Sequence, residues 1–196
     1  MVMVIKLKTK EKIMETAITL FNEKGYSNVS LREIAQNANT TIGNLTYHFK
    51  KKEDLVDAII SDLHENYSFY FNKDLKDEQI LNYLIESFKQ EDINYQRYAF
   101  YFKDMNTIIS NSDTLKHKKD QFQYDLYLYY KQSLTYLKKV DLIRDEITIE
   151  DLDLLALSMA SISAGYMNPS SINANPLINC PTITELLTGL LKPYLK

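Results

Sequence analysis

Apolar residues recur three and four positions apart along most of this 196-residue chain, the spacing that gathers them on one face of an α-helix. The first stripe predicts a helix from Thr9 or Lys10 to Lys24, with Gly25 as its C-terminal stop. Its members are Ile13, Ala17, Leu20 and Phe21. Only 4 Gly and 4 Pro interrupt the chain, and no alternating segment of strand length stands out. The pattern therefore predicts an all-α protein.

Two short helices joined by a tight turn are predicted in residues 30–49. Ser30 and Glu33 have the spacing of a reciprocal capping box, so a helix is expected to begin directly after Ser30. Its apolar face consists of Leu31, Ile34, Ala35 and Ala38. Asn39 stands where a left-handed residue would end this helix, and the hydroxyls of Thr40 and Thr41 offer caps for the next one. The arrangement is typical of a helix-turn-helix.

The outward side of the second short helix carries side chains suited to DNA. They donate or accept hydrogen bonds, as contacts with base edges and phosphates require. They are Thr41, Asn44, Tyr47 and His48. Lys50, Lys51 and Lys52 follow directly, and such cations interact favourably with a phosphate backbone. The pattern indicates a DNA-reading element, and the competing interpretation is an ordinary corner of a helical protein with a basic surface.

The rest of the chain predicts a long helix followed by an all-helical second part. The long helix starts at Lys52 and continues to about Phe71, and Asp54 near its start suits the helix dipole. Further helices are expected over residues 76–90, 93–110, 115–140, 149–165 and 182–195. Residues 168–181 are rich in Asn, Ser and Pro and predict a long loop.

Charge is divided unevenly along the chain. Through Lys52 there are nine Lys or Arg against four Asp or Glu, a balance of +5. The remainder has fourteen against twenty-two, or −8, which gives the overall net charge of −3. A basic end on an acidic body suits a protein that holds DNA at one end, because neutralising phosphates supplies much of the affinity. A solvated charged surface is the alternative interpretation.

Motifs and composition argue against an enzyme or a membrane protein. None of His48, His64 and His117 has another His or Cys at metal-ligand spacing, and no phosphate loop or nucleophile motif is present. No catalytic residue, metal or cofactor is therefore expected. The single Cys180 cannot form an internal disulfide, and no apolar run approaches a membrane span. These features predict a cytoplasmic protein.

From Thr9 to Leu55 the chain resembles the N-terminal domain of the TetR/AcrR family of bacterial transcription regulators. The shared positions are Glu11, Ile13, Ala17, Leu20, Phe21, Gly25, Tyr26, Ser30, Ile34, Ala35, Gly43, Leu45, Tyr47, His48, Phe49, Lys52, Glu53, Asp54 and Leu55. The resemblance implies a three-helix DNA-binding domain in residues 1–52. It also implies a larger helical effector-binding and dimerisation domain in residues 53–196, with a linking helix over about residues 52–72.

The same resemblance implies which residues meet DNA. It assigns Tyr47 and His48 to the DNA backbone or bases, Lys52 to a phosphate, and Arg32 to a helix position that often reaches DNA. The predicted DNA-binding set is thus Arg32, Thr41, Asn44, Tyr47, His48 and Lys52. Three positions depart from the family's usual residues, namely Asn39, Ile42 and Thr46. The operator sequence therefore does not carry over from the family.

A small-molecule pocket among the middle helices is also implied by the resemblance. Two Tyr-rich segments, residues 95–105 and 122–137, supply the candidate ligand-binding residues. These are Tyr98, Phe102, Met105, Tyr124 and Tyr127. An aromatic wall would suit a small hydrophobic or aromatic effector, which no residue pattern identifies. Core packing is the competing interpretation for each of these residues.

Dimerisation is expected through the last two helices, whose apolar and small residues could pair with a second copy in a four-helix bundle. The candidate residues are Leu157, Ala160, Ser161, Ala164, Leu187, Leu190 and Leu191. The family resemblance supports this expectation, since its members typically dimerise through their final helices. An internal core is the alternative.

Taken together, these features predict a homodimeric, ligand-responsive repressor that a small effector releases from a palindromic operator in double-stranded DNA. Two alternatives stay open. One is a helical DNA-binding protein, an activator included, that is controlled by a protein partner instead of a small ligand. The other is a helical interaction module whose N-terminal unit no longer binds DNA, which the departures at Ile42 and Thr46 suggest.

Overall fold

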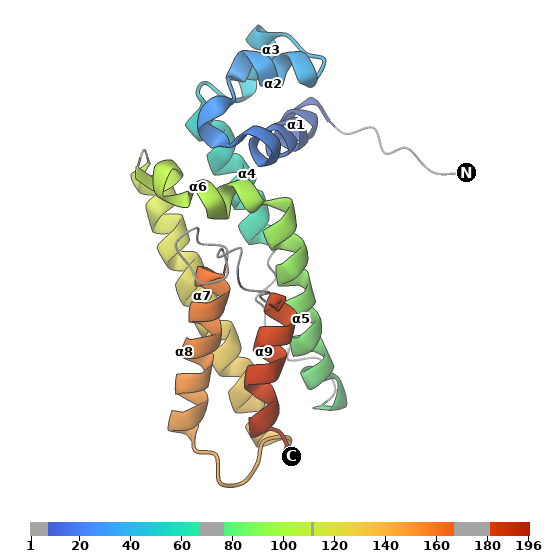
Figure 1. Cartoon of the computed structure of the whole chain (residues 1–196), viewed down its shortest axis with the longest axis vertical. Helices are drawn as coiled ribbons and strands as arrows, with labels where there is room; N and C mark the ends of the chain where they lie inside the picture. Colours follow the sequence, from blue (N-terminus) through green and yellow to red (C-terminus); the bar gives the residue numbers. More distant parts are fainter. Residues whose placement is uncertain (1–7, 67–76, 111, 167–180) are drawn as a thin grey trace, which may run out of the picture. The chain divides into compact units, whose positions relative to one another are not determined.

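The structure, a computed structural model, describes residues 8–66, 77–110, 112–166 and 181–196 (Figure 1). Within these ranges the backbone is helical or irregular, and one isolated bridge pairs Ile143 with Leu195. The elements are α1 (Thr9–Lys24), the 3-10 turn η1 (Tyr26–Asn28), α2 (Leu31–Asn37), α3 (Ile42–His48), α4 (Lys52–Asn66), α5 (Asp77–Arg97), α6 (Ala99–Ser110), α7 (Asp113–Lys139), α8 (Ile149–Gly165), α9 (Ile183–Leu191) and the 3-10 turn η3 (Lys192–Tyr194). The predicted all-α fold with an N-terminal helix-turn-helix is confirmed.

Packing groups these elements into two compact units. The first unit contains α1, η1, α2, α3, α4 and α6, and the second contains most of α5 and α7 together with α8 and α9. The two units are defined by contacts between helices. They are therefore not the same as the two predicted functional domains, which meet between residues 52 and 53. That functional boundary stays a prediction. The predicted end of the linking helix, between residues 67 and 72, lies outside the described residues.

The first unit is built on the apolar stripe of α1. Ile13, Ala17 and Phe21 have no exposed surface, and the ring of Phe21 lies 5.0 Å from that of Phe100 on α6. The helix ends as predicted at Gly25, whose φ of 81° is costly for any residue with a Cβ atom. Helix α2 likewise ends before Asn39, which adopts the predicted left-handed conformation with a φ of 52°.

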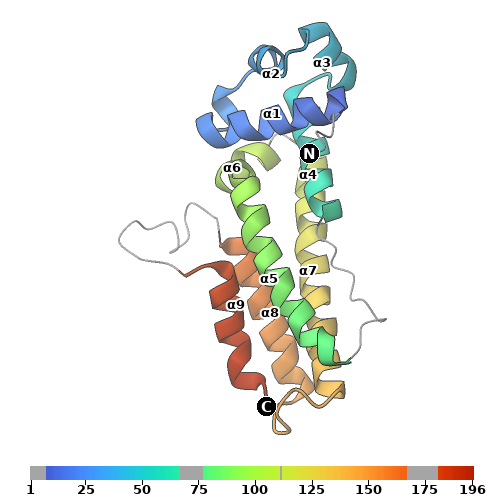
Figure 2. The same ribbon diagram turned by 90° about the vertical axis from the view of Figure 1, so that its right-hand side faces the viewer.

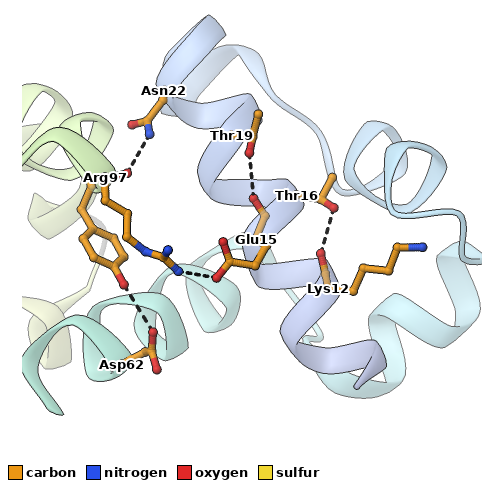
Figure 3. Close-up of polar contacts among 8 residues, drawn as sticks. Lys12, Glu15, Thr16, Thr19, Asn22, Asp62 and Arg97 are labelled. Carbon is orange, nitrogen blue, oxygen red and sulfur yellow. Dashed lines mark hydrogen bonds and ion pairs between the residues drawn. The ribbon is translucent and has the colours of Figure 1, made fainter. Parts of the chain in front are cut away.

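The predicted break between two helices at residues 91–92 is wrong. Helix α5 continues to Arg97, and α6 starts at Ala99. The break is set by Asn22 on α1, whose side-chain amide donates to the carbonyl oxygen of Arg97 at 2.7 Å (Figure 3). The same amide group accepts from the backbone amide of Phe100 at 2.8 Å. One side chain thus satisfies the backbone on both sides of the break. Because Asn22 is 75 residues away along the chain, no local pattern could indicate this boundary.

Further polar contacts hold α6 and the end of α5 within the first unit. The carboxylate of Asp104 accepts from the backbone amide of Tyr26 at 2.7 Å. Arg97 pairs with Glu15 on α1, and the hydroxyl of Tyr98 donates to Asp62 on α4 at 3.3 Å (Figure 3). Helix α6 is therefore part of the scaffold that supports the helix-turn-helix.

In the second unit, helices α8 and α9 lie side by side (Figure 2). Each begins with a capping box, formed by Thr148 with Asp151 and by Thr182 with Glu185. The start of α9 is also fixed to α5, because Asp92 accepts from the backbone amides of residues 183 and 184 at 2.9 and 3.1 Å. The predicted final helix, residues 182–195, is α9 followed by η3, and the predicted loop lies almost wholly outside the described residues.

Candidate nucleic-acid interface

Helix α3 is positioned by one cap and two buried apolar residues. The hydroxyl of Thr41, one of the two predicted caps, accepts from the backbone amide of Asn44 at 3.1 Å. Leu45 and Phe49 point inward and are 0% and 3% exposed. This anchoring fixes which side of the helix faces solvent.

The opposite side of α3 presents several predicted DNA-binding residues to solvent. Tyr47 is 83% exposed, Thr41 and Asn44 are exposed, and His48 is half-buried with its ring 5.2 Å from the ring of Tyr47. An aromatic side chain this exposed makes little contribution to packing. Its position on a short, well-anchored helix suits contact with another molecule.

Ile42 adds an apolar side chain to the same face. It is 42% exposed at the first position of α3. In the described part of the first unit, Ile42 and Tyr47 are the two large hydrophobic residues that are exposed, and both belong to this seven-residue helix. From the sequence, Ile42 is a departure from the usual residue of the TetR/AcrR family and is not among the predicted site residues.

Several polar groups of this helix are bonded within the helix itself. The side-chain amide of Asn44 donates to the hydroxyl of Thr40 at 2.8 Å. The hydroxyl of Thr46 is within hydrogen-bonding distance of the carbonyl oxygens of Ile42 and Gly43, at 2.9 and 3.1 Å. These internal bonds reduce the number of donors that the face offers to a ligand.

The cations around α3 differ in what they contact. Arg32 on α2, Lys50 and Lys51 are exposed. The side chain of Lys52 instead turns inward and donates to the carbonyl oxygens of Tyr26 and Val29, at 2.8 and 3.0 Å. Its ammonium group also lies 4.2 Å from the centre of the Tyr26 ring.

These contacts make Lys52 a structural link between η1 and the start of α4. Burial lowers the pKa of the Lys52 ammonium group. Burial also raises the pKa of Tyr26 to about 12, and the nearby carboxylate of Glu53 acts in the same direction. The predicted contact of Lys52 with a DNA phosphate stays a prediction, and the exposed Lys50 and Lys51 are placed more favourably for one.

The predicted ligand-binding residues fall into both units. In the first unit Tyr98 and Phe102 are buried and Met105 is half-buried. In the second unit Tyr124 is 56% exposed, and Tyr127 donates to Asp153 on α8 at 2.6 Å. The rings of Tyr124 and Tyr127 lie 6.4 Å apart. Their role in effector binding stays a prediction.

The predicted dimerisation residues divide between the surface and the core of the second unit. Leu157 is 54% exposed and Ser161 is exposed, on the face of α8 that also carries the 64% exposed Leu154. Half-buried positions are Ala164 and Leu190. The buried members are Ala160, Leu187 and Leu191. The exposed face of α8 is therefore the part of the predicted set that is accessible to a second copy.

A buried carboxyl group in the second unit was not predicted from the sequence. Glu91 on α5 is 2% exposed, and its carboxyl group accepts from the hydroxyl of Tyr130, which also lies 3.1 Å from the hydroxyl of Ser163. Burial raises the pKa of Glu91 to about 7, although both hydroxyls lower it. The hydroxyl groups beside Glu91 come from α7 and α8, so no local signal marked it.

Neither a metal-binding group nor a membrane-spanning helix is present among the described residues. Among them, no three or more His, Cys, Asp or Glu side chains are grouped so that they could hold a metal ion. None of the described helices has the length and apolarity needed to cross a membrane.

Comparison with known proteins matches this geometry. Residues 13–59, which include α2 and α3, match the family model of bacterial regulatory proteins of the tetR family. The chain is 44% identical over 64 residues to the probable HTH-type transcriptional regulator YttP of Bacillus subtilis, a match that covers 33% of this chain and 31% of YttP. It is 28% identical over 120 residues to IcaR of Staphylococcus epidermidis, a negative regulator of the biofilm operon icaADBC, over 51% of this chain and 64% of IcaR.

Solved structures with the same fold extend over nearly the whole chain. A TetR-family regulator from Marinobacter aquaeolei superposes with a TM-score of 0.78 at 20% identity, over 97% of this chain and 92% of the other. SmeT, the repressor of the multidrug efflux pump SmeDEF of Stenotrophomonas maltophilia, superposes in its complex with triclosan with a TM-score of 0.66 at 19% identity. That superposition covers 96% of this chain and 92% of SmeT.

Proposed function

By its N-terminal domain this chain belongs to the TetR family, and we propose that it is a homodimeric transcriptional regulator, a repressor that a small molecule releases from double-stranded DNA. The observation that carries the proposal is the exposure of Tyr47 on α3, inside the segment that matches the family model. The chain matches less than a third of YttP and under two thirds of IcaR, so DNA binding by the whole protein is part of the proposal.

Base contacts would come from the exposed face of α3, with Arg32 and the lysines after α3 on the phosphates. Phosphate contacts position a protein on DNA, and contacts to base edges specify the sequence. Of the predicted set, Thr41, Asn44 and Tyr47 are exposed, which supports their role at the interface. Lys52 supports the interface from within, by holding α4 against η1.

The dimer would form through the exposed face of α8, around Leu154, Leu157 and Ser161. Large apolar side chains at helical spacing are costly to leave in water, and a second copy would cover them. A twofold dimer would place two copies of α3 in successive major grooves, about 34–36 Å apart, on a palindromic operator.

The effector would be a small hydrophobic or aromatic molecule bound among the helices that follow the DNA-binding domain. The triclosan complex of SmeT supports a ligand of this kind in a protein of the same fold. Repression is supported by IcaR and SmeT, which are named as a negative regulator and a repressor. The effector would weaken DNA binding by having a higher affinity for the conformation that does not bind the operator.

Selection of bound duplexes from a random DNA pool tests the proposal. We expect the selected sequences to share two inverted half-sites with centres 10–10.5 base pairs apart, or a multiple of that spacing. Tyr47→Ala should lose enrichment of these sequences, whereas Tyr124→Ala, which removes an exposed tyrosine on α7, should retain it. Failure of the unsubstituted protein to enrich any duplex at low salt would refute DNA binding.

A further inference from the structure

The face of α3 that would meet DNA is unusual in offering an exposed aliphatic side chain at its first position. Ile42 is 42% exposed, although the neighbouring exposed residues, Thr41 and Asn44, are polar. Exposing an isoleucine to water is unfavourable, and its β-branched side chain has few rotamers, so its methyl groups are held in defined places. Such a side chain is suited to contact an apolar group of defined position.

Hydrogen-bonding readout by the residues next to Ile42 is restricted. The hydroxyl of Thr41 accepts from the Asn44 amide, and the amide group of Asn44 donates to Thr40. The hydroxyl of Thr46 is bonded to backbone oxygens of the same helix. Bidentate recognition of a base by an Asn side chain needs both its donor and its acceptor. One of the two N–H donors of Asn44 is engaged by Thr40, so the polar side chains beside Ile42 offer fewer donors, and apolar contact by Ile42 can add to the reading of a base.

Gly43 makes close approach possible beside Ile42. Apart from its two chain neighbours and the backbone of its own helix, a Cβ atom at Gly43 would meet only the Thr41 hydroxyl, at 3.9 Å, and the helical backbone there requires no glycine. Gly43 is exposed and follows Ile42 directly, so the surface of α3 carries no side chain at the position after Ile42. A base edge in the major groove can approach that position.

The apolar group that DNA displays in its major groove is the C5-methyl group of thymine. We propose that Ile42, with the gap at Gly43 beside it, contacts a thymine methyl group in each operator half-site and thereby determines part of the sequence preference. This inference rests on the proposed function, since it assumes that α3 enters the major groove. It adds the chemical class of base that this chain reads and the residue that reads it.

Replacing single thymines by deoxyuridine tests the inference, because it removes the methyl group and leaves base pairing unchanged. In a duplex obtained by selection, we expect one thymine per half-site whose replacement weakens binding about fourfold, the effect of one buried methyl group. Replacing both should weaken binding about fifteenfold. For Ile42→Ala the same replacements should have no effect, and Ile42→Val should give an intermediate response.

Two controls separate the possible outcomes. Ile93→Ala, which removes an exposed isoleucine on α5, should respond to deoxyuridine as the unsubstituted protein does, and circular dichroism should show that each variant is folded. If the protein binds its selected duplex equally well after every thymine replacement, the inference is overturned while DNA binding stands. The inference is also overturned if Ile42→Ala loses affinity on thymine replacement as the unsubstituted protein does. A protein that binds no duplex overturns the proposed function itself.

Discussion

Glu91 should make the stability of the second unit fall as the pH rises toward neutrality. Burial raises the pKa of this carboxyl group from an ordinary value of 4.5 to about 7, so the folded protein keeps the proton to a higher pH than the unfolded chain does. Its contribution to stability is therefore fully present below about pH 4.5 and is lost as the pH rises through about 7. The difference between the two pKa values corresponds to about 3 kcal/mol.

Glu91→Gln isolates this contribution, because glutamine has nearly the same shape and never ionises. Its side-chain oxygen can still accept from the Tyr130 hydroxyl. Between pH 4 and pH 8 the free energy of unfolding of the unsubstituted protein should fall by about 3 kcal/mol relative to that of the variant. Above pH 7 the variant should therefore be the more stable of the two, because no charge is buried.

Urea unfolding followed by circular dichroism at several pH values measures the effect, at one protein concentration because dimerisation would also change the stability. Glu86→Gln is the matched control, since Glu86 lies on the same helix with 65% of its side chain exposed. The control should keep the pH dependence of the unsubstituted protein. Parallel pH profiles for the unsubstituted protein and Glu91→Gln would refute the reasoning.

Three further substitutions test other parts of the account. Gly43→Ala should leave the unfolding temperature unchanged or raise it, because alanine fits there and favours a helix by up to about 1 kcal/mol. The same substitution should lower operator affinity about tenfold in a titration with labelled DNA, and unchanged affinity would argue against close approach of DNA at this position. Lys52→Met should lower the free energy of unfolding by about 1–2 kcal/mol in thermal unfolding, because two carbonyl oxygens lose their donor. Lys50→Met, at an exposed position, should leave it unchanged, and equal effects of the two substitutions would argue against an internal role for Lys52. Leu157→Arg should halve the molecular mass measured by light scattering, because its charge would be buried in the dimer contact. Ile93→Arg should leave the mass unchanged. An unchanged mass for Leu157→Arg would place the dimer contact elsewhere.

Features set by neighbouring residues were predictable from the sequence. The first helix has its predicted bounds, and Asn39 takes the left-handed conformation that was expected where α2 ends. The cap at Thr41 and the inward direction of Leu45 follow from spacing alone. These signals lie within a few residues of the features they control, which is why the helix-turn-helix could be located and its outward face assigned.

Features set by distant residues were not predictable. The break between α5 and α6 depends on Asn22, and the burial of Glu91 depends on Tyr130 and Ser163 from other helices. Lys52 appeared to be one more cation in a basic run, and only the fold shows that its ammonium group meets two backbone oxygens. In each case a polar group is satisfied across the fold, and sequence spacing contains no signal for such a contact.

Titration of a selected, fluorescently labelled duplex with the unsubstituted protein, Tyr47→Ala and Tyr124→Ala at one salt concentration tests the central claim most directly. If α3 reads DNA, Tyr47→Ala should weaken binding on the order of ten- to a hundredfold, while Tyr124→Ala should bind as tightly as the unsubstituted protein. Equal affinity of all three proteins for the duplex would contradict the assignment of the exposed face of α3 to DNA.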